Sequence, residues 1–186
     1  MSKAVMISIR PKWCEKICSG EKTIEVRKTR PKLETPFKVY IYCTLPKYPH
    51  EDFIATDYPK PQFYGGGKVI GEFTCDRIYK IDKDSTDFLF KAGGLSVYKQ
   101  AAEEKCGLRV AMTDDELHGY LRHGQGYGWH ISDLHICDAP RELSEFERPY
   151  ECNECDANWA TECNACHEEG KIKRAPQSWC YVEEDT

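Results

Sequence analysis

The sequence predicts an α+β fold: a small, mainly antiparallel β-barrel with short flanking helices and a separate four-cysteine metal knuckle. Three observations favour this class. Five or six segments have strand character, the helical segments between them are short, and four of the 11 cysteines fall within residues 152–166. A chain of 186 residues is long enough for one domain with a real core and a small appendage.

The first segments predict a strand, a helix and a second strand. Residues 5–9 are apolar and indicate a short buried strand. Pro11 suits the first turn of a helix over 11–19, and Gly20 suits its C-cap. Residues 22–28 (KTIEVRK) alternate between apolar and polar side chains, which predicts a half-buried strand.

The middle of the chain combines strands with a long connection. Residues 37–43 (FKVYIYC) are rich in β-branched and aromatic side chains, as strands are. Residues 44–67 hold four prolines and end in three glycines, which is typical of a functional loop. Residues 68–81 return to strand character, and Gly71 is a candidate β-bulge.

The remaining elements are two helices and two strands. We expect helices over 96–105 and 113–122. Thr113 and the glutamate three residues later form a capping box at the start of the second helix. Residues 126–137 predict a strand, and residues 178–182 predict the last one.

The net charge of −5 conceals an asymmetry along the chain. Residues 1–48 hold 11 Lys/Arg and 4 Asp/Glu, a net charge of +7, whereas residues 49–140 carry −5 and residues 141–186 carry −7. A globally acidic chain is a poor non-specific coat for nucleic acid, but one basic segment can still form a local phosphate-facing patch. A chance unevenness among solvated charges is the alternative.

The composition also indicates the cellular compartment of the protein. No apolar run approaches the ~20 residues of a membrane span, and the N-terminus lacks the apolar stretch of a secretory signal. We therefore expect a cytoplasmic protein without membrane contact. An odd number of cysteines in such a chain argues against a disulfide scaffold and for free thiols plus a metal site.

The cysteine cluster predicts a structural zinc site. Two CxxC motifs, Cys152 with Cys155 and Cys163 with Cys166, are separated by seven residues. Each motif can place two thiolates on one Zn²⁺, and four thiolates close its coordination sphere. An iron–sulfur cluster, with His167 available to replace one ligand, is the alternative.

The N-terminal segment gathers the side chains best suited to bind an anionic or aromatic ligand. Cations can contact phosphate or base edges, a carboxylate can accept from an exocyclic amine, and tryptophans can stack on bases. Glu25 and Arg27 share a strand face, and Lys22 joins them only if it belongs to the preceding turn. The ligand-binding residues we expect are Lys12, Trp13, Lys22, Glu25, Arg27, Glu72 and Trp129.

In this segment the sequence resembles the ASCH family, a branch of the PUA-like superfamily. The matching pieces are residues 20–28 (GEKTIEVRK), 39–42 (VYIY), 67–73 (GKVIGEF), 128–131 (GWHI) and 176–179 (PQSW). The resemblance covers most of residues 4–150 and the final strand. The cysteine cluster looks like an insertion between the last two of these pieces.

The resemblance implies a small β-barrel with a cleft that binds RNA or nucleotides. It also implies possible catalysis, since some members resemble ribonucleases and one branch hydrolyses N4-acetylcytidine with a lysine, a threonine three residues later and a distant glutamate. The lysine falls on Lys22, but Glu25 occupies the threonine position, and Glu103 or Glu104 is the candidate distant glutamate. Lys22 and Glu25 are thus the candidate catalytic residues. Glu25 would act as a general base, with Lys22 or Arg27 stabilising an oxyanion.

These observations predict three segments and one preferred function. Residues 1–150 form the ASCH/PUA-like barrel, 151–175 the zinc-binding insertion, and 176–186 the closing strand and tail. We expect a protein that binds single-stranded nucleic acid or a nucleotide. The alternatives are a small hydrolase acting on N4-acylated cytidine or on RNA phosphodiesters, and a metal-stabilised adaptor whose acidic C-terminal module meets a protein partner. An ion-pair network without ligand is the purely structural interpretation of Lys22, Glu25 and Arg27.

Overall fold

The computed structural model describes residues 2–55, 63–84, 87–122, 124–149 and 170–184. The chain divides into two compact units that interleave in sequence. Unit 1 comprises Met1–Lys12, Lys38–Glu72 and Ile136–Thr186, and unit 2 comprises Trp13–Phe37 and Phe73–His135. The four-cysteine segment lies outside the described residues, so the metal knuckle and the boundaries drawn around it stay predictions.

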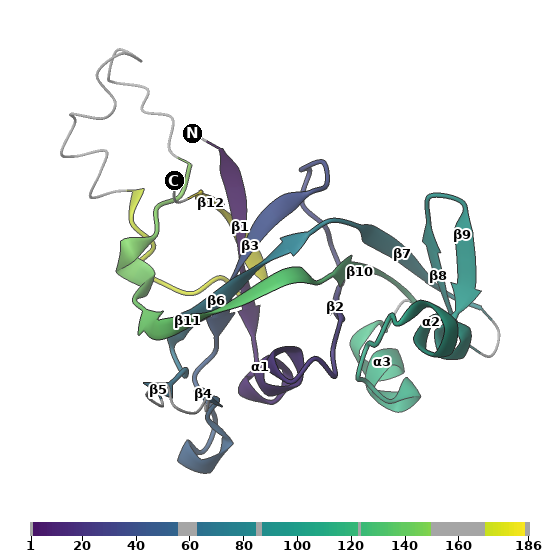
Figure 1. The fold of residues 1–186 in the computed structure, drawn as a ribbon, viewed down its shortest axis with the longest axis horizontal. Coiled ribbons are helices and arrows are strands. Elements are labelled where there is room, and N and C mark those ends of the chain that lie inside the picture. Colours follow the sequence, from purple (N-terminus) through teal and green to yellow (C-terminus); the bar gives the residue numbers. More distant parts are fainter. Residues whose placement is uncertain (1, 56–62, 85–86, 123, 150–169, 185–186) are drawn as a thin grey trace. The chain divides into compact units, whose positions relative to one another are not determined.

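Strands dominate the secondary structure, and the α-helices are short (Figure 1). The helices are α1 (Pro11–Cys18), α2 (Lys99–Cys106) and α3 (Asp114–Tyr120). The strands are β1 (Lys3–Ile9), β2 (Ile24–Arg27), β3 (Phe37–Cys43), β4 (Ile54–Ala55), β5 (Phe63–Tyr64), β6 (Lys68–Cys75), β7 (Ile78–Lys83), β8 (Phe88–Ala92), β9 (Leu95–Tyr98), β10 (Gln125–His130), β11 (Ser132–Arg141) and β12 (Trp179–Glu183). Short 3-10 turns occupy Pro49–Glu51 and Leu143–Glu145.

Unit 1 is built on a five-stranded sheet with the strand order β11-β6-β3-β1-β12, in which β6 and β11 continue into unit 2. β1 pairs in parallel with β3 and antiparallel with β12, so the last strand of the chain lies beside the first. Apolar side chains from these strands, among them Met6, Tyr40 and Val182, pack with Phe146 and Ile172 into one core. The final strand expected at 178–182 is therefore present and paired.

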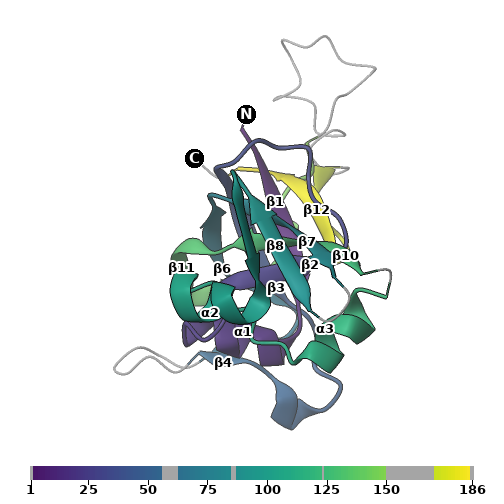
Figure 2. The same ribbon diagram turned by 90° about the vertical axis from the view of Figure 1, so that its right-hand side faces the viewer.

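Unit 2 is built on a second five-stranded sheet with the order β2-β10-β7-β8-β9. The ladders between these neighbouring strands are antiparallel. Helices α2 and α3 cover one face of the sheet (Figures 1 and 2), because Ala102 and Leu117 pack into the same core as Ile81, Phe88 and Phe90. The capping box expected at Thr113 begins α3 as predicted.

The structure confirms a mainly antiparallel, sheet-rich α+β fold with few helices. It does not contain the closed barrel that the sequence predicted: in the described part of the chain the strands form two five-stranded sheets and a two-stranded ladder. A barrel requires the two edge strands of one sheet to pair. Here β11 and β12 are the edges of one sheet, and β2 and β9 are the edges of the other.

Three elements differ in extent from those predicted. Residues 68–81 form two strands, because exposed Asp76 and Arg77 separate β6 from β7. Residues 126–137 likewise form β10 and β11, with a break at Ile131 and a positive φ of 47° at Asp133. The helix expected from residue 96 begins at Lys99. Residues 95–98 instead form β9, which pairs with β8 across a glycine turn.

No helix within the described ranges is both long enough and apolar enough to cross a membrane.

Gly126 in β10 provides a stability test of this architecture. A Cβ added there would lie 2.9 Å from the carbonyl oxygen of Arg27 and 2.7 Å from Leu121 Cδ2, so the backbone of β2 would have to shift. Gly126→Ala should lower the free energy of unfolding by about 1–3 kcal/mol, the usual cost of overpacking. Urea unfolding measures it.

Gly119→Ala in α3 is the matched control, because a Cβ there meets no atom within 4 Å. Alanine has the higher helix propensity, by about 1 kcal/mol, so this variant should be as stable as the parent or more stable. Equal losses at both positions would contradict the packing described for β10.

Candidate functional site

Lys22 lies in the turn between α1 and β2, and its backbone N–H donates to the carbonyl oxygen of Lys16 at 2.8 Å. Glu25 and Arg27 follow on alternate positions of β2, so their side chains share a face. Because Lys22 precedes the strand, the alternation of strand faces does not separate it from Glu25. The turn therefore brings together the three residues of the ion cluster, Lys22, Glu25 and Arg27.

The ion cluster is buried and internally paired. Lys22 Nζ lies 3.4 Å from Glu25 Oε2, and Arg27 Nη2 lies 3.0 Å from Glu25 Oε1. Lys22 Nζ also donates to the carbonyl oxygen of Val110 at 2.7 Å. The three residues are only 2%, 6% and 7% exposed, so both carboxylate oxygens of Glu25 are engaged away from solvent.

Burial also alters the acidity of the cluster. Removal from water lowers the pKa of Lys22 below its ordinary value of 10.5, and the neighbouring Glu25 carboxylate opposes this shift. The loss of hydration outweighs the ion pair. Protonated Lys22 is thus held at a cost in free energy, and it depends on Glu25 and on the Val110 carbonyl for compensation.

Thr23 connects the same turn to the loop after α2. Its Oγ1 donates to the carbonyl oxygen of Gly107 at 2.8 Å and accepts from the backbone N–H of Arg109 at 2.8 Å. The backbone N–H groups of Thr23 and Ile24 donate to the carbonyl oxygen of Arg109. The Thr23 side chain therefore serves to hold the turn before β2 against the 107–109 segment.

The two tryptophans proposed as stacking platforms have different environments. Trp13 on α1 is half-buried, and Lys22 Nζ lies 5.2 Å from its ring centroid. Trp129 is opposite Glu25 in the β10–β2 ladder, is 0% exposed, and packs edge-on against Phe37. A base cannot reach Trp129 in this conformation, whereas Trp13 is partly accessible.

The last two predicted ligand-binding residues belong to unit 1. Lys12 is exposed on the first turn of α1. Glu72 on β6 is half-buried and pairs with Lys38, whose Nζ lies 3.4 Å from Glu72 Oε1. The structure therefore assigns five of the seven predicted residues to unit 2 and gives Glu72 a local ion-pair partner.

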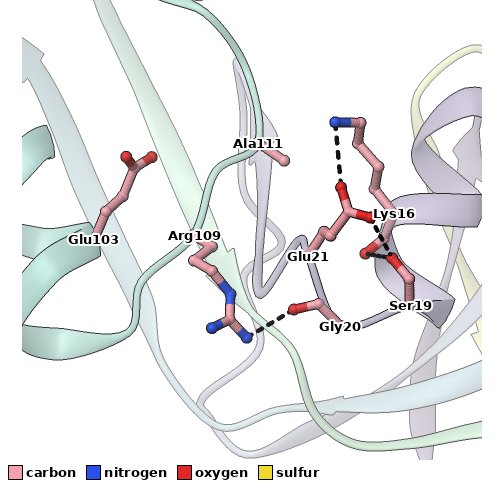
Figure 3. Close-up of a pocket in the computed structure, with 7 residues that line it drawn as sticks. All are labelled: Lys16, Ser19, Gly20, Glu21, Glu103, Arg109 and Ala111. Carbon is pink, nitrogen blue, oxygen red and sulfur yellow. Dashed lines mark hydrogen bonds and ion pairs between the residues drawn. The ribbon is translucent and has the colours of Figure 1, made fainter.

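Unit 2 contains a pocket of about 520 Å³ (Figure 3). Two segments of the pocket wall are next in sequence to residues that the ion cluster contacts. Glu21 precedes Lys22, and Arg109 and Ala111 lie on either side of Val110, whose carbonyl oxygen accepts from Lys22. The ion cluster thus binds together the two segments that form the pocket wall. The complete lining is Lys16, Ser19, Gly20, Glu21, Glu103, Arg109 and Ala111.

The pocket presents both cationic and anionic groups. Arg109 donates from Nη2 to the carbonyl oxygen of Gly20 at 2.7 Å, and Lys16 Nζ lies 3.5 Å from Glu21 Oε2 (Figure 3). The Gly20 bond engages one of the five N–H donors that a guanidinium carries. Among the described residues, no side chain forms a hydrogen bond or ion pair with Glu103 on α2. Arg109 and Glu103 are therefore the groups best placed to meet a ligand.

Ala111 at the pocket wall has a left-handed backbone, with φ of 58°. This conformation costs an L-residue about 1–2 kcal/mol, and such strain persists where surrounding contacts impose it. Here the neighbouring Val110 carbonyl is held by Lys22. The sequence did not reveal the 107–111 loop as part of the site, because its main contribution is backbone carbonyl groups.

Two exposed cations of unit 2 lie beyond the C-terminal end of β2, each near an aromatic ring. Lys28 Nζ lies 5.2 Å from the ring centroid of Tyr120, and the guanidinium carbon of Arg30 lies 5.9 Å from that of Tyr127. Lys28 follows β2 directly, and Arg30 comes two residues later. This basic–aromatic surface, defined by these four residues, carries part of the +7 charge of residues 1–48.

The described residues contain no group of three or more His, Cys, Asp or Glu side chains arranged to hold a metal. The predicted zinc ligands Cys152, Cys155, Cys163 and Cys166 are not among them. Seven other cysteines in the described part of the chain form no disulfide bond, as the odd cysteine count led us to expect.

No protein-family model matches the chain, and no curated protein matches it. Among solved structures, the ASCH protein of Zymomonas mobilis is similar, with a TM-score of 0.49, 17% identity, and coverage of 97% of this chain and 88% of that one. A mutant of the same protein gives a TM-score of 0.49 and 17% identity, with coverage of 98% and 92%.

The lowered pKa of Lys22 predicts a pH-dependent stability. Between the lowered pKa and 10.5 the unfolded chain binds the proton more strongly than the folded chain does, so stability rises with pH in that window. Lys22→Met removes this titration. The free energy of unfolding of the parent relative to Lys22→Met should therefore increase from neutral pH toward 10.5, as urea titrations at several pH values measure. A constant or decreasing difference would contradict the burial of the ammonium group.

Proposed function

We propose that this chain is a nucleotide- or nucleic-acid-binding protein of the ASCH type, and that unit 2 binds the ligand in the pocket beside the ion cluster. One observation carries the proposal: the wall of a pocket of about 520 Å³ is held in place by the buried ion pairs of the ion cluster. Small-molecule sites are concave and largely preformed, with volumes of about 300–1,000 Å³.

The lining of the pocket fits a ligand with both acidic and amine or hydroxyl groups. Arg109 can donate paired hydrogen bonds to a phosphate. Glu103 can accept from a ribose hydroxyl or from an exocyclic amine such as that of cytosine. A purely anionic ligand would be repelled by Glu21 and Glu103, which both line the pocket. A nucleotide, with a phosphate at one end and donors on its base and sugar, satisfies both kinds of group.

In this proposal the ion cluster positions the pocket wall. Lys22 is 1% exposed at its side chain and already contacts Glu25 and the Val110 carbonyl. Its role is to fix the 107–111 loop against the turn after α1, so that Arg109 and Glu21 are preorganised. Preorganisation raises affinity because less side-chain and loop ordering remains to be done on binding.

The basic–aromatic surface suits a longer ligand. Lys28 and Arg30 are exposed next to tyrosine rings, the combination that binds single strands through phosphates and stacked bases. We infer that single-stranded RNA or DNA places one nucleotide in the pocket and neighbouring phosphates on this surface. The family resemblance of residues 20–28 supports the same ligand class.

Hydrolysis of N4-acylated cytidine or of RNA is the weaker alternative. The observation in its favour is the lowered pKa of Lys22, which is typical of lysines that transfer protons. Against it, the amine and both Glu25 oxygens are engaged in buried contacts, and a nucleophile with its base must meet the substrate. Binding is therefore the function that we favour.

The four cysteines remain a proposed structural zinc site. Two CxxC pairs supply four thiolates, a donor set that closes the coordination of Zn²⁺. Metal analysis of the purified protein should find one zinc ion per chain, and Cys163→Ser should lose it. Retention of stoichiometric zinc by the serine variant, or two irons or more per chain, would contradict the assignment. The module is also the proposed surface for a protein partner.

Removing the Arg109 charge tests the binding proposal. Charge-assisted hydrogen bonds contribute about 1.5–3 kcal/mol, so Arg109→Gln should weaken binding of cytidine 5′-monophosphate about tenfold or more. Isothermal titration calorimetry measures the dissociation constants. Lys105→Gln is the matched control, since Lys105 is exposed on α2 and does not line the pocket.

The proposal predicts that Lys105→Gln binds like the parent. Equal weakening in both variants would indicate a non-specific charge effect. No binding of the nucleotide by the parent protein would reject the pocket as a nucleotide site.

A further inference from the structure

Unit 1 contains a second cavity, of about 460 Å³, along the edge strand β12. Residues of β12, the segment leading into it, the start of β1 and the segment after the Leu143–Glu145 turn form its walls. The lining includes two aromatic rings and two cations, Trp179, Tyr181, Lys3 and Arg148. None of these residues takes part in the pocket of unit 2.

The aromatic rings occupy alternate positions of β12 and therefore the same face of the strand. Trp179 and Tyr181 meet edge to face, with ring centroids 5.4 Å apart and planes at 77°. In the ladder with β1 they lie opposite Ile7 and Val5, which are fully buried. Both rings are only half-buried, so each combines support from the sheet with area that is accessible in the cavity.

The charge of this cavity differs from that of unit 2. Lys3 and Arg148 are exposed cations, and the described residues that line the cavity include no carboxylate. Cys180 also lines it, and burial raises the pKa of its thiol, which is therefore uncharged at neutral pH. Glu183 lies opposite Lys3 in the ladder and Glu147 precedes Arg148, but neither lines the cavity. The cavity itself thus favours an anionic ligand.

Backbone hydrogen bonds hold the cavity walls in place. Ser8 fixes the segment before β12, because its N–H donates to the carbonyl oxygen of Ser178 at 2.9 Å and its hydroxyl to that of Pro176 at 2.6 Å. On the other side, the N–H of Arg148 donates to the carbonyl oxygen of Gly170 at 2.8 Å, and that of Glu183 to Glu147 at 2.9 Å. The rings and cations are therefore presented on fixed backbone.

We propose that this cavity is a second nucleic-acid subsite, which binds one nucleotide of a single strand by stacking its base on Trp179 or Tyr181 and by placing a phosphate on Lys3 and Arg148. Base stacking on aromatic side chains and phosphate contacts by Lys and Arg are the general means of binding single strands. An acidic peptide would use the cations but not the rings. The rings are the reason that a nucleic acid is favoured.

The subsite is distinct from the pocket of unit 2, so its test begins by disabling that pocket. In a background in which Lys16, Arg109, Lys28 and Arg30 are replaced by Gln, so that the cations of that pocket and of the basic–aromatic surface are absent, fluorescence anisotropy measures the binding of labelled oligouridine over a salt series. Arg148→Gln should weaken binding about tenfold and reduce the slope of log K against log salt by about 1, as loss of one phosphate contact does. Lys173→Gln, an exposed cation of unit 1 outside the cavity, should bind like the background protein.

Stacking is tested separately from charge. Trp179→Leu should weaken binding about tenfold, because each stacked base contributes about 1–3 kcal/mol, whereas Trp179→Phe retains a ring and should stay within about threefold. Thermal unfolding establishes that the variants fold. If Trp179→Leu does not fold, fluorescence quenching tests stacking instead. Oligouridine should quench the tryptophan fluorescence of the background protein, and Trp179→Phe should abolish the part of the quenching that comes from Trp179.

Absence of oligouridine binding in the background protein would overturn the subsite. So would unchanged binding in Arg148→Gln and the Trp179 variants, or equal competition by oligoglutamate, which would identify a site for acidic peptides. None of these results affects the nucleotide proposal for unit 2, which is tested by Arg109→Gln in the otherwise unaltered protein.

Discussion

Burial of three charges at the start of β2 is the constraint on which the site in unit 2 depends. Each ion loses several kcal/mol of hydration when it leaves water, and removal of one partner from such a group costs about 3–5 kcal/mol. Glu25 is the common partner, because its two oxygens face Lys22 and Arg27. The chain therefore tolerates this arrangement only while all three side chains and the Val110 carbonyl stay together.

That requirement connects two segments far apart in sequence. Lys22 and Thr23 are joined to residues 107–110 by side-chain and backbone hydrogen bonds. The pocket lies where these segments meet, and the left-handed Ala111 is part of its wall. Ion pairs on a protein surface add little to stability. Because the ion cluster is buried, it instead holds the two segments that form the pocket wall.

Much of this could be predicted from local patterns. The strand character of residues 22–28 and 37–43, Pro11 at the helix start and the Thr113 capping box each indicate a local element that is present in the structure. The half-buried strand expected at residues 22–28 is wrong in its burial, because both faces of β2 are buried and its polar face holds the ion cluster. The convergence of Lys22, Glu25 and Arg27 was predictable because the three lie within one turn and one strand. The β8–β9 hairpin was missed because its strands are short and half-exposed. A local signal was present, since Gly93 and Gly94 form the two-residue turn that is typical of hairpins.

Other features had no local signal. The acceptor for Lys22 is a backbone carbonyl 88 positions away, and any residue type supplies one. The burial of Trp129 depends on its position opposite Glu25 and against Phe37, which only the pairing of strands determines. The sheets themselves were predicted as one closed barrel because alternation shows which residues form strands, but not which strands pair at the edges.

Hydrogen exchange of Glu25→Gln tests most directly whether the ion cluster holds the pocket wall. The amide hydrogens of Lys22, Thr23 and Ile24 donate to the carbonyl oxygens of Lys16 and Arg109, so they report on that wall. Loss of the Glu25 charge leaves Lys22 and Arg27 buried without their anion. Faster exchange at these three amides, with protection of the β7 and β8 amides retained, is the predicted result. Unchanged protection at residues 22–24 would contradict the account.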